Sequence, residues 1–175
     1  PFSTGSQGGG AGGGGRIALY YNDDSAFTPQ SFEAAGGCVN MPGGAGTIYL
    51  ECTGTPGLLR LDNRGHVTSE AIPTPVDCHA NAFDRMEVLR SARLDVTVTQ
   101  AVAYASLTVS NATMTHTGLL AGPELDVVLR GNSVLTHTVG DPNGLRIDAN
   151  AVTVGPGAAI DVGSKGMGAL PATEG

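Results

Sequence analysis

The chain has 175 residues, of which 27 are Gly, 14% are charged and none is Trp. Its hydrophobic content of 41% is too high for a disordered chain, so we expect a core of Val, Leu, Ile and Ala side chains. The net charge of −7, with Lys165 as the single lysine, leaves no basic face for nucleic acid or anionic lipid. No run approaches the roughly 20 apolar residues of a spanning helix, so no membrane insertion is expected.

The first part of the chain combines Gly-rich sequence with short strands. Residues 1–15 are Gly-rich and lack the GK[ST] that follows in a phosphate-binding loop. Apolar or β-branched runs bounded by Gly, Pro, Asn or Asp then predict strands at 16–21, 46–52 and 58–63. Residues 64–83 are polar and contain prolines that interrupt any alternation. We expect this segment to be an insertion that protrudes from the fold and tolerates shortening.

From Asp84 onward the apolar pattern becomes regular. Four stretches alternate apolar with polar residues: 85–90, 106–111, 124–132 and 144–150. Their apolar pairs start at intervals of 21, 18 and 20 residues: Met86/Val88, Leu107/Val109, Leu125/Val127 and Leu145/Ile147. A period near 20 made only of short strands and turns is typical of a β-solenoid, in which each coil stacks on the last.

A repeated motif supports this reading. "NATMTHT" at 111–117 is echoed by "NSVLTHT" at 132–138 and more weakly by "NAVTVGP" at 150–156. Stacked coils lie about 4.8 Å apart, so residues one coil apart form ladders of like side chains. The repeat predicts a corner ladder of asparagines, which tolerate left-handed backbone: Asn111, Asn132 and Asn150.

The sequence therefore predicts an all-β fold. Residues 84–165 are expected to form a right-handed parallel β-helix with coils of about 18–21 residues and Gly-rich ends. A β-sandwich is the alternative, because its strands also recur with regularly spaced turns.

Several segments resemble one known family. "GGGGRIALYYND", "GGAGTIYL", "LLRLDN" and "LRIDANAVTVGPGAAIDVGSKGMG" are similar to the Gly-rich tandem modules of very large, repetitive bacterial surface or secreted proteins. The resemblance implies that residues 16–63 close one unit, that 84–165 begin the next, and that 166–175 start a further Gly-rich segment. It implies an excerpt of a longer protein, extracellular or at the cell surface, with neighbouring modules of the same polypeptide as partners. It brings no known activity, ligand or cofactor.

The repeated motif also predicts a surface ladder. Its members are Thr115, His116, Thr117, Thr136, His137 and Thr138. The two histidines could stack as metal ligands, but two are too few, so solvated histidines and no metal site are expected. The paired threonines resemble the flat hydroxyl arrays of ice-binding solenoids, although Thr is also the ordinary exposed β-former.

Three aspartates are candidates for carbohydrate chemistry. Pectin lyases and polygalacturonases use a β-helix with Asp clusters that bind calcium or act as acid and base. Asp95, Asp126 and Asp148 are the candidates here, with Arg146 as the only nearby base. Alternation against Leu, Val and Ile already places the three carboxylates outward without any catalytic task.

The sequence does not decide whether its three cysteines are free thiols or form a disulfide. Cys38, Cys52 and Cys78 form no CxxC pair and have no His at ligand spacing, so a structural zinc site has no support. They are expected either as buried small apolar side chains or as one disulfide and a free thiol.

The function expected from the sequence is a non-enzymatic structural or adhesive module without a cofactor. The alternative is a carbohydrate-binding or polysaccharide-cleaving β-helix, with extracellular carbohydrate as its partner. An ice-binding solenoid is a third hypothesis.

Overall fold

The computed structural model describes residues 11–23, 28, 31–38, 42–67, 72–78, 83–98 and 103–166. These residues form β-strands and no α-helix, which confirms the predicted all-β class. The strands are β1 (Arg16–Tyr21), β2 (Thr47–Cys52), β3 (Leu58–Asp62), β4 (Thr74–Cys78), β5 (Arg85–Leu89), β6 (Arg93–Val98), β7 (Ser106–Ser110), β8 (Thr113–Ala121), β9 (Asp126–Arg130), β10 (Val134–Thr136), β11 (Leu145–Asp148), β12 (Ala151–Val154) and β13 (Ala159–Ile160). Within the described ranges, no helix is long and apolar enough to cross a membrane.

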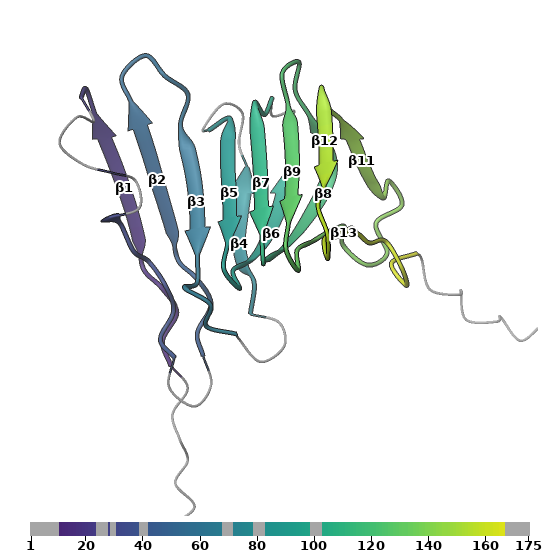
Figure 1. The fold of residues 1–175 in the computed structure, drawn as a ribbon, viewed down its shortest axis with the longest axis horizontal. Helices are drawn as coiled ribbons and strands as arrows, with labels where there is room; N and C mark the ends of the chain where they lie inside the picture. The colour runs from purple at the N-terminus through teal and green to yellow at the C-terminus, as the bar shows by residue number, and fades with distance from the viewer. Residues whose placement is uncertain are drawn as a thin grey trace, which may run out of the picture.

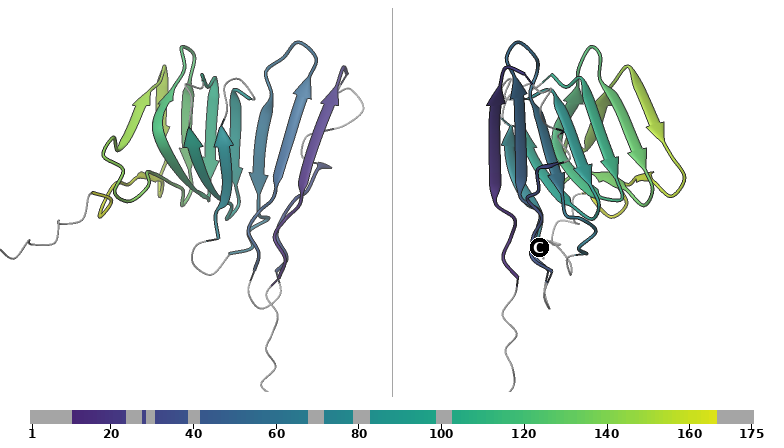
Figure 2. Two further views of the ribbon diagram at one scale, coloured as in Figure 1. Left: turned by 180° about the vertical axis from the view of Figure 1, so that it is seen from behind. Right: turned by 60° about the vertical axis from the view of Figure 1, so that its left-hand side comes forward.

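The strands build two largely parallel sheets. The first sheet has seven strands in the order β1-β2-β3-β5-β7-β9-β12, and the second has the order β13-β10-β8-β6-β4. Figure 1 shows the first sheet across the front, with β4, β6 and β8 behind it, and Figure 2 shows both layers from behind. β11 pairs with the C-terminal part of β8. Among the described pairings, only that of β2 with β3 is antiparallel.

From β5 onward the chain passes back and forth between the two sheets. A strand of the first sheet is followed by a tight corner and a strand of the second, as in β5–β6, β7–β8 and β9–β10. The corner residues Arg90, Ser91, Asn111 and Gly131 have φ values of 45°, 68°, 48° and 61°. Left-handed backbone of this kind reverses the chain direction within two or three residues.

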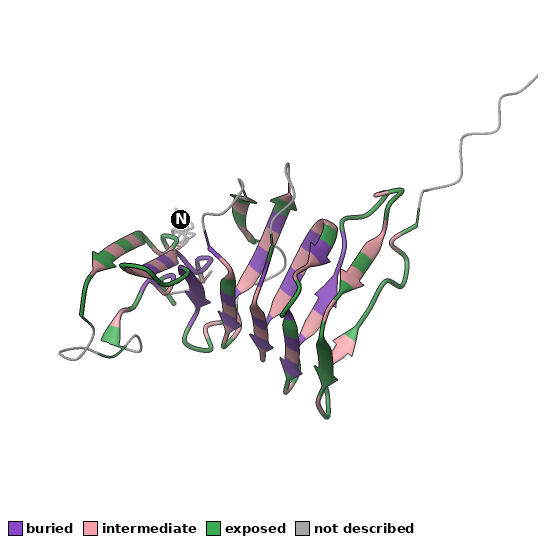
Figure 3. Cartoon of the chain, turned by 90° about the horizontal axis from the view of Figure 1, so that it is seen from above, coloured by how far each residue is buried: buried purple, intermediate pink, exposed green. Residues whose placement is uncertain are grey.

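The main core lies between the two sheets. Inward side chains of the first sheet sit on directly paired positions, as for Met86 with Leu107 and Leu107 with Val127. The second sheet contributes Leu94 and Met114, which are also paired. All five are at most 1% exposed. The alternation seen in the sequence arises because every second residue of each strand enters this core. Figure 3 shows the buried positions concentrated in the middle strands, whereas β12 is exposed.

A second, smaller core lies on the opposite face of the first sheet. It contains Ala34, Ile48, Leu50 and Leu58, with Ile17, Leu19, Tyr21 and Phe32 packed against it. On β3, Leu58 belongs to this core, whereas Leu59 and Leu61 belong to the main core. Side chains of consecutive strand residues point to opposite faces, so every residue of β3 is buried.

The Gly-rich sequence has a packing role. The segments 11–15, 34–37 and 43–46 lie side by side and are joined by backbone hydrogen bonds. These include Gly14 N–H to Gly44 O at 2.9 Å, Gly37 N–H to Gly12 O at 2.9 Å and Gly46 N–H to Ala34 O at 2.6 Å. A Cβ would overlap backbone atoms of a neighbouring segment at Gly14, Gly36, Gly43 and Gly46. Only glycine allows backbones to approach so closely.

A pair of glycine substitutions tests this packing. Gly46→Ala places a methyl group against the backbone of Gly15 and is expected to lower the free energy of unfolding by about 2 kcal/mol. Gly15→Ala is the matched control, because a Cβ there meets nothing within 4 Å. Urea titrations of the two variants measure the difference. Equal losses of stability would contradict the close-packed arrangement.

The predicted register needs a correction. Met86 pairs with Leu107 as expected, but Leu107 pairs with Val127 and not with Leu125. Leu145 pairs with Gly118 of β8, and the strand that continues the first sheet is β12. Alternation has a period of two, so a shift of two residues leaves the pattern unchanged. The sequence pattern therefore predicted the strands of β9 and β11 but not their partners.

The expected insertion at 64–83 also needs a correction. Thr74–Cys78 forms β4, which pairs in parallel with β6 and forms an edge of the second sheet. A proline is tolerated in β4 because edge strands need fewer backbone donors. Residues 68–71 and 79–82 of this segment lie outside the described residues, as do 1–10 and 167–175.

Candidate functional site

Asn111 and Asn132 lie at corresponding corners of neighbouring strand pairs, as predicted. The Asn111 side-chain oxygen accepts a hydrogen bond from the backbone N–H of Asn132 at 3.2 Å. The Asn111 backbone N–H in turn donates to Arg130 O at 3.0 Å. Gly131 has a φ of 61°, and a Cβ there would meet the Asn111 side-chain amide, so both its backbone conformation and this contact favour glycine. The contact therefore joins successive corners.

Asn150 does not continue this ladder, and the three-asparagine prediction is wrong for this residue. Asn150 precedes β12, where its side-chain amide donates to the Asp126 carboxylate at 3.0 Å. The residue next to Asn132 along the stack is Gly157, at which a Cβ would meet the Asn132 amide oxygen. The longer connection between β10 and β12 shifts Asn150 to a different corner.

The two histidines are buried, which contradicts the expectation of solvated side chains. His116 is 0% exposed and pairs with Val96 of β6, so it occupies an inward column. Its ring lies edge-on to Tyr104, with centroids 6.0 Å apart, and its Nε2 is 3.5 Å from the tyrosine hydroxyl. His137 is 6% exposed, and its Nδ1 lies 2.9 Å from Thr138 O. Met114 and His116 are two residues apart on β8, so their side chains point to the same, inward face.

Burial has a large electrostatic consequence for His116. Removal of the imidazole from water lowers its pKa to about 4, and the backbone of Gly118 opposes this only in part. His116 is therefore neutral at pH 7. Across the described residues, no group of three or more His, Cys, Asp or Glu side chains is placed to hold a metal ion.

The threonines form columns along the second sheet, but not a continuous exposed array. Thr115 pairs with Thr136, and the Thr117 and Thr138 hydroxyls lie 2.9 Å apart. Thr136 is only 5% exposed, and the two positions that precede Thr115 in its column are Pro75 and Asp95 rather than Thr. The flat threonine surface that ice binding requires is interrupted at both positions.

The three candidate aspartates lie on three different strands. Asp95 lies on β6 of the second sheet and Asp126 on β9 of the first, whereas Asp148 lies on β11, which pairs with the C-terminal part of β8. Asp126 and Asp148 are exposed. Paired carboxylates for glycoside hydrolysis must flank one bond, and Asp95 lies on the other sheet from Asp126.

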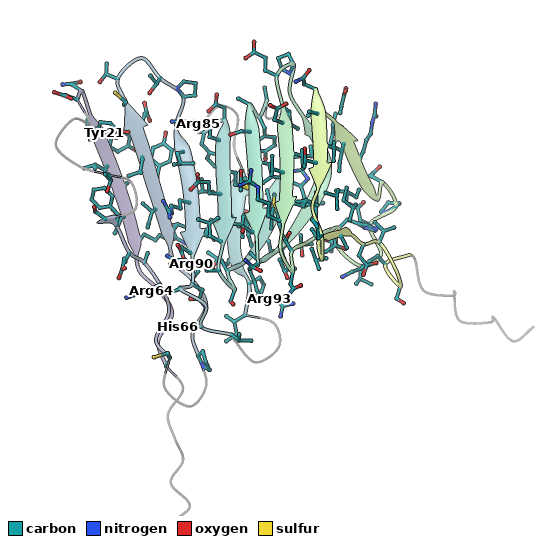
Figure 4. All side chains as sticks on the ribbon, in the orientation of Figure 1. Tyr21, Arg64, His66, Arg85, Arg90 and Arg93 are labelled. Carbon is teal, nitrogen blue, oxygen red and sulfur yellow. The ribbon has the colours of Figure 1, made fainter. Side chains whose placement is uncertain are left out.

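A charged cluster that the sequence did not indicate lies at the end of β3. Arg90 donates to both carboxylate oxygens of Asp62, and Arg60 Nη2 lies 3.6 Å from the same carboxylate. Burial alone would raise the pKa of Asp62, but the hydrogen bonds from Arg90 and from the Arg64 backbone N–H outweigh it and lower this pKa. Figure 4 shows Arg64, His66 and Arg90 near this end of the sheet.

Next to this cluster, the Asn63 side chain is fully buried and joins three backbone segments. Its oxygen accepts from Gly36 N–H at 2.9 Å, and its amide nitrogen donates to His66 O at 2.7 Å and to Gly43 O at 3.4 Å. The Asp62 and Asn63 contacts hold the corner after β3 against the Gly-rich segments. The pair ends the segment "LLRLDN", but its residue types alone do not distinguish these contacts from an ordinary turn.

The described cysteines are free thiols. Cys38 and Cys52 do not form a disulfide with each other. Cys38 is exposed, which disagrees with the expectation that all three cysteines are buried. The side chain of Cys78 lies outside the described residues.

The chain was compared with known proteins in three ways. Searches of protein-family models, of curated proteins and of solved structures find no match to this chain.

Proposed function

We propose that the chain is a non-enzymatic structural or adhesive segment of a larger, repetitive extracellular or cell-surface protein. Residues 84–165 are proposed to form a right-handed parallel β-helix that stacks on neighbouring modules of the same polypeptide. The sequence resemblance to Gly-rich tandem modules of bacterial surface proteins agrees with this assignment.

The parallel register is the observation that carries the proposal. In the first sheet Met86, Leu107, Val127 and Val152 occupy successive paired positions. The chain visits the second sheet between each of these strands. A chain that alternates between two sheets and returns one strand further along follows the path of a β-helix coil, and such parallel connections are almost always right-handed. A β-sandwich of the usual kind would pair its strands antiparallel.

Exposed apolar side chains at the C-terminal end of the stack support the proposal that another coil packs there. Among the strands that the structure describes, β12 and β13 are the last of their sheets. Val152 and Val154 are each 47% exposed, and Ile160 is 40% exposed, although their paired neighbours Val127, Leu129 and Leu135 are completely buried. Apolar side chains in inward columns are stabilised when a further coil covers them.

The proposal predicts that the outward aspartates are dispensable. Changing Asp95, Asp126 and Asp148 together to Asn is expected to alter the melting temperature by only a few degrees, since exposed substitutions each change stability by less than about 0.5 kcal/mol. Neither millimolar calcium nor acidic polysaccharides should shift the melting curve of either protein, and a chelator provides the control. A ligand-dependent increase in the wild type that the variant lacks would favour a carbohydrate-active β-helix instead.

A further inference from the structure

A cavity of about 550 Å³ opens at one end of the first three strands. Its most buried lining consists of Leu50 and Leu58, which are 1% and 9% exposed. Tyr21 and Cys52, the last residues of β1 and β2, line the same cavity. The volume lies within the roughly 300 to 1,000 Å³ typical of small-molecule sites. The antiparallel pairing of β2 with β3 brings these strand ends together.

The rim of this cavity combines a turn and a cation. Thr55 and Pro56 come from the turn between β2 and β3, and Arg85 is the first residue of β5. Arg85 is the one charged side chain among the described residues that line the cavity. Figure 4 shows Tyr21 and Arg85 at the same end of the sheet, on either side of β2 and β3.

The Arg85 guanidinium has capacity for a ligand. Its side chain is 45% exposed, and Nη2 donates to Pro56 O at 3.0 Å. Its Nε forms an ion pair with the Asp84 carboxylate at 3.9 Å, which is beyond hydrogen-bond distance and leaves the N–H donor unused. A guanidinium has five N–H donors, so one hydrogen bond leaves donors for a carboxylate. The bond to Pro56 also fixes the guanidinium beside the turn.

We propose that this cavity binds a small monocarboxylate with an apolar ring. The ring would lie against Leu50, Leu58 and Tyr21, and its carboxylate would accept hydrogen bonds from Arg85. The guanidinium shares its charge with Asp84, so it suits at most one further negative charge, whereas a phosphate dianion would need a second cation that the described lining does not supply. A ligand cation would meet Arg85 as a like charge and be repelled.

The probe for this site is 2-naphthoate, followed by fluorescence anisotropy. The protein has no Trp, so excitation at a wavelength that its four tyrosines do not absorb gives a naphthyl signal without protein emission. Saturable binding to the wild type is expected, and the neutral analogue 2-naphthalenemethanol should bind about tenfold more weakly because it lacks the charge-assisted hydrogen bonds. Arg85→Gln should weaken naphthoate binding by a similar factor and leave the alcohol unchanged. Arg130→Gln, on the exposed face of β9, is the matched control and should bind like the wild type.

A second measurement uses the cysteines of the unmodified chain. Cys52 lines the cavity, whereas Cys38 is exposed elsewhere, so bound naphthoate should slow alkylation of Cys52 by iodoacetamide and leave Cys38 unaffected. Peptide mass spectrometry reads both sites in one sample. This readout decides the matter if Arg85→Gln fails to fold. The proposal is overturned if millimolar naphthoate shows no saturation, if acid and alcohol bind equally, or if both cysteines react at unchanged rates.

Discussion

Replacing Asn63 by Ala is expected to lower the free energy of unfolding by about 4 kcal/mol, because it leaves several backbone groups without partners. The lost bonds are those to Gly36, Gly43 and His66, and the first two are buried. Each buried polar group without a hydrogen bond costs about 1 to 3 kcal/mol. Chemical unfolding followed by circular dichroism measures the loss.

Two further variants make the Asn63 result specific. Asn143→Ala removes an amide from an exposed turn and should cost less than about 0.5 kcal/mol. Asn63→Asp keeps the acceptor for Gly36 N–H but directs a carboxylate at two carbonyl oxygens, so this variant should regain stability as the pH falls and the carboxyl becomes protonated. A loss near that of Asn143→Ala would show that the three contacts contribute little.

The second large effect is a dependence of stability on pH through His116. Its pKa is about 4 in the folded protein and 6.5 in the unfolded chain. Between these values the unfolded state binds the proton more readily, so stability is complete above pH 6.5 and falls as the pH decreases towards 4. At about 1.4 kcal/mol for each pH unit, the loss is about 3 kcal/mol.

The variant His116→Leu isolates this contribution. Leucine is apolar and of similar volume, and the neighbouring position in the column is already Val96. Carboxylates also titrate in this range, so the measurement is the difference between the two stability curves from pH 7.5 to 4. Over this range the free energy of unfolding of the wild type should fall by about 3 kcal/mol more than that of the variant. Parallel curves would mean that His116 gains access to water or a partner when protonated.

The strands could be predicted from the sequence because burial on one face imposes a period of two. This signal located β5 and β7 and their pairing, since both lie in the middle of the sheet with one face inward. It could not determine which residues of β9 pair with which residues of β7, because a shift of two residues preserves every inward position. The correct register depends on how many residues form each corner, and the alternation of apolar and polar residues does not reveal this number.

The candidate site was less accessible to sequence reasoning. The contact between Asn111 and Asn132 followed from their spacing, but burial of His116 depends on which way its strand faces. Thr and His alternate in "THT", and a polar sequence gives no indication that the His column points inward. The cavity between Tyr21 and Arg85 draws on four separate strands, so no local pattern marks it.

Strand β3 separates the two cores and belongs to both of them. Leu58 packs on one side, and Leu59 and Leu61 pack on the other. An opening that removes β3 from the sheet exposes apolar surface on both faces at once, so its free-energy cost includes contributions from both clusters. Loss of packing on either side therefore reduces the cost of the same opening. Energetic coupling between the N-terminal strands and the C-terminal stack follows from this shared strand, without any change of shape to transmit it.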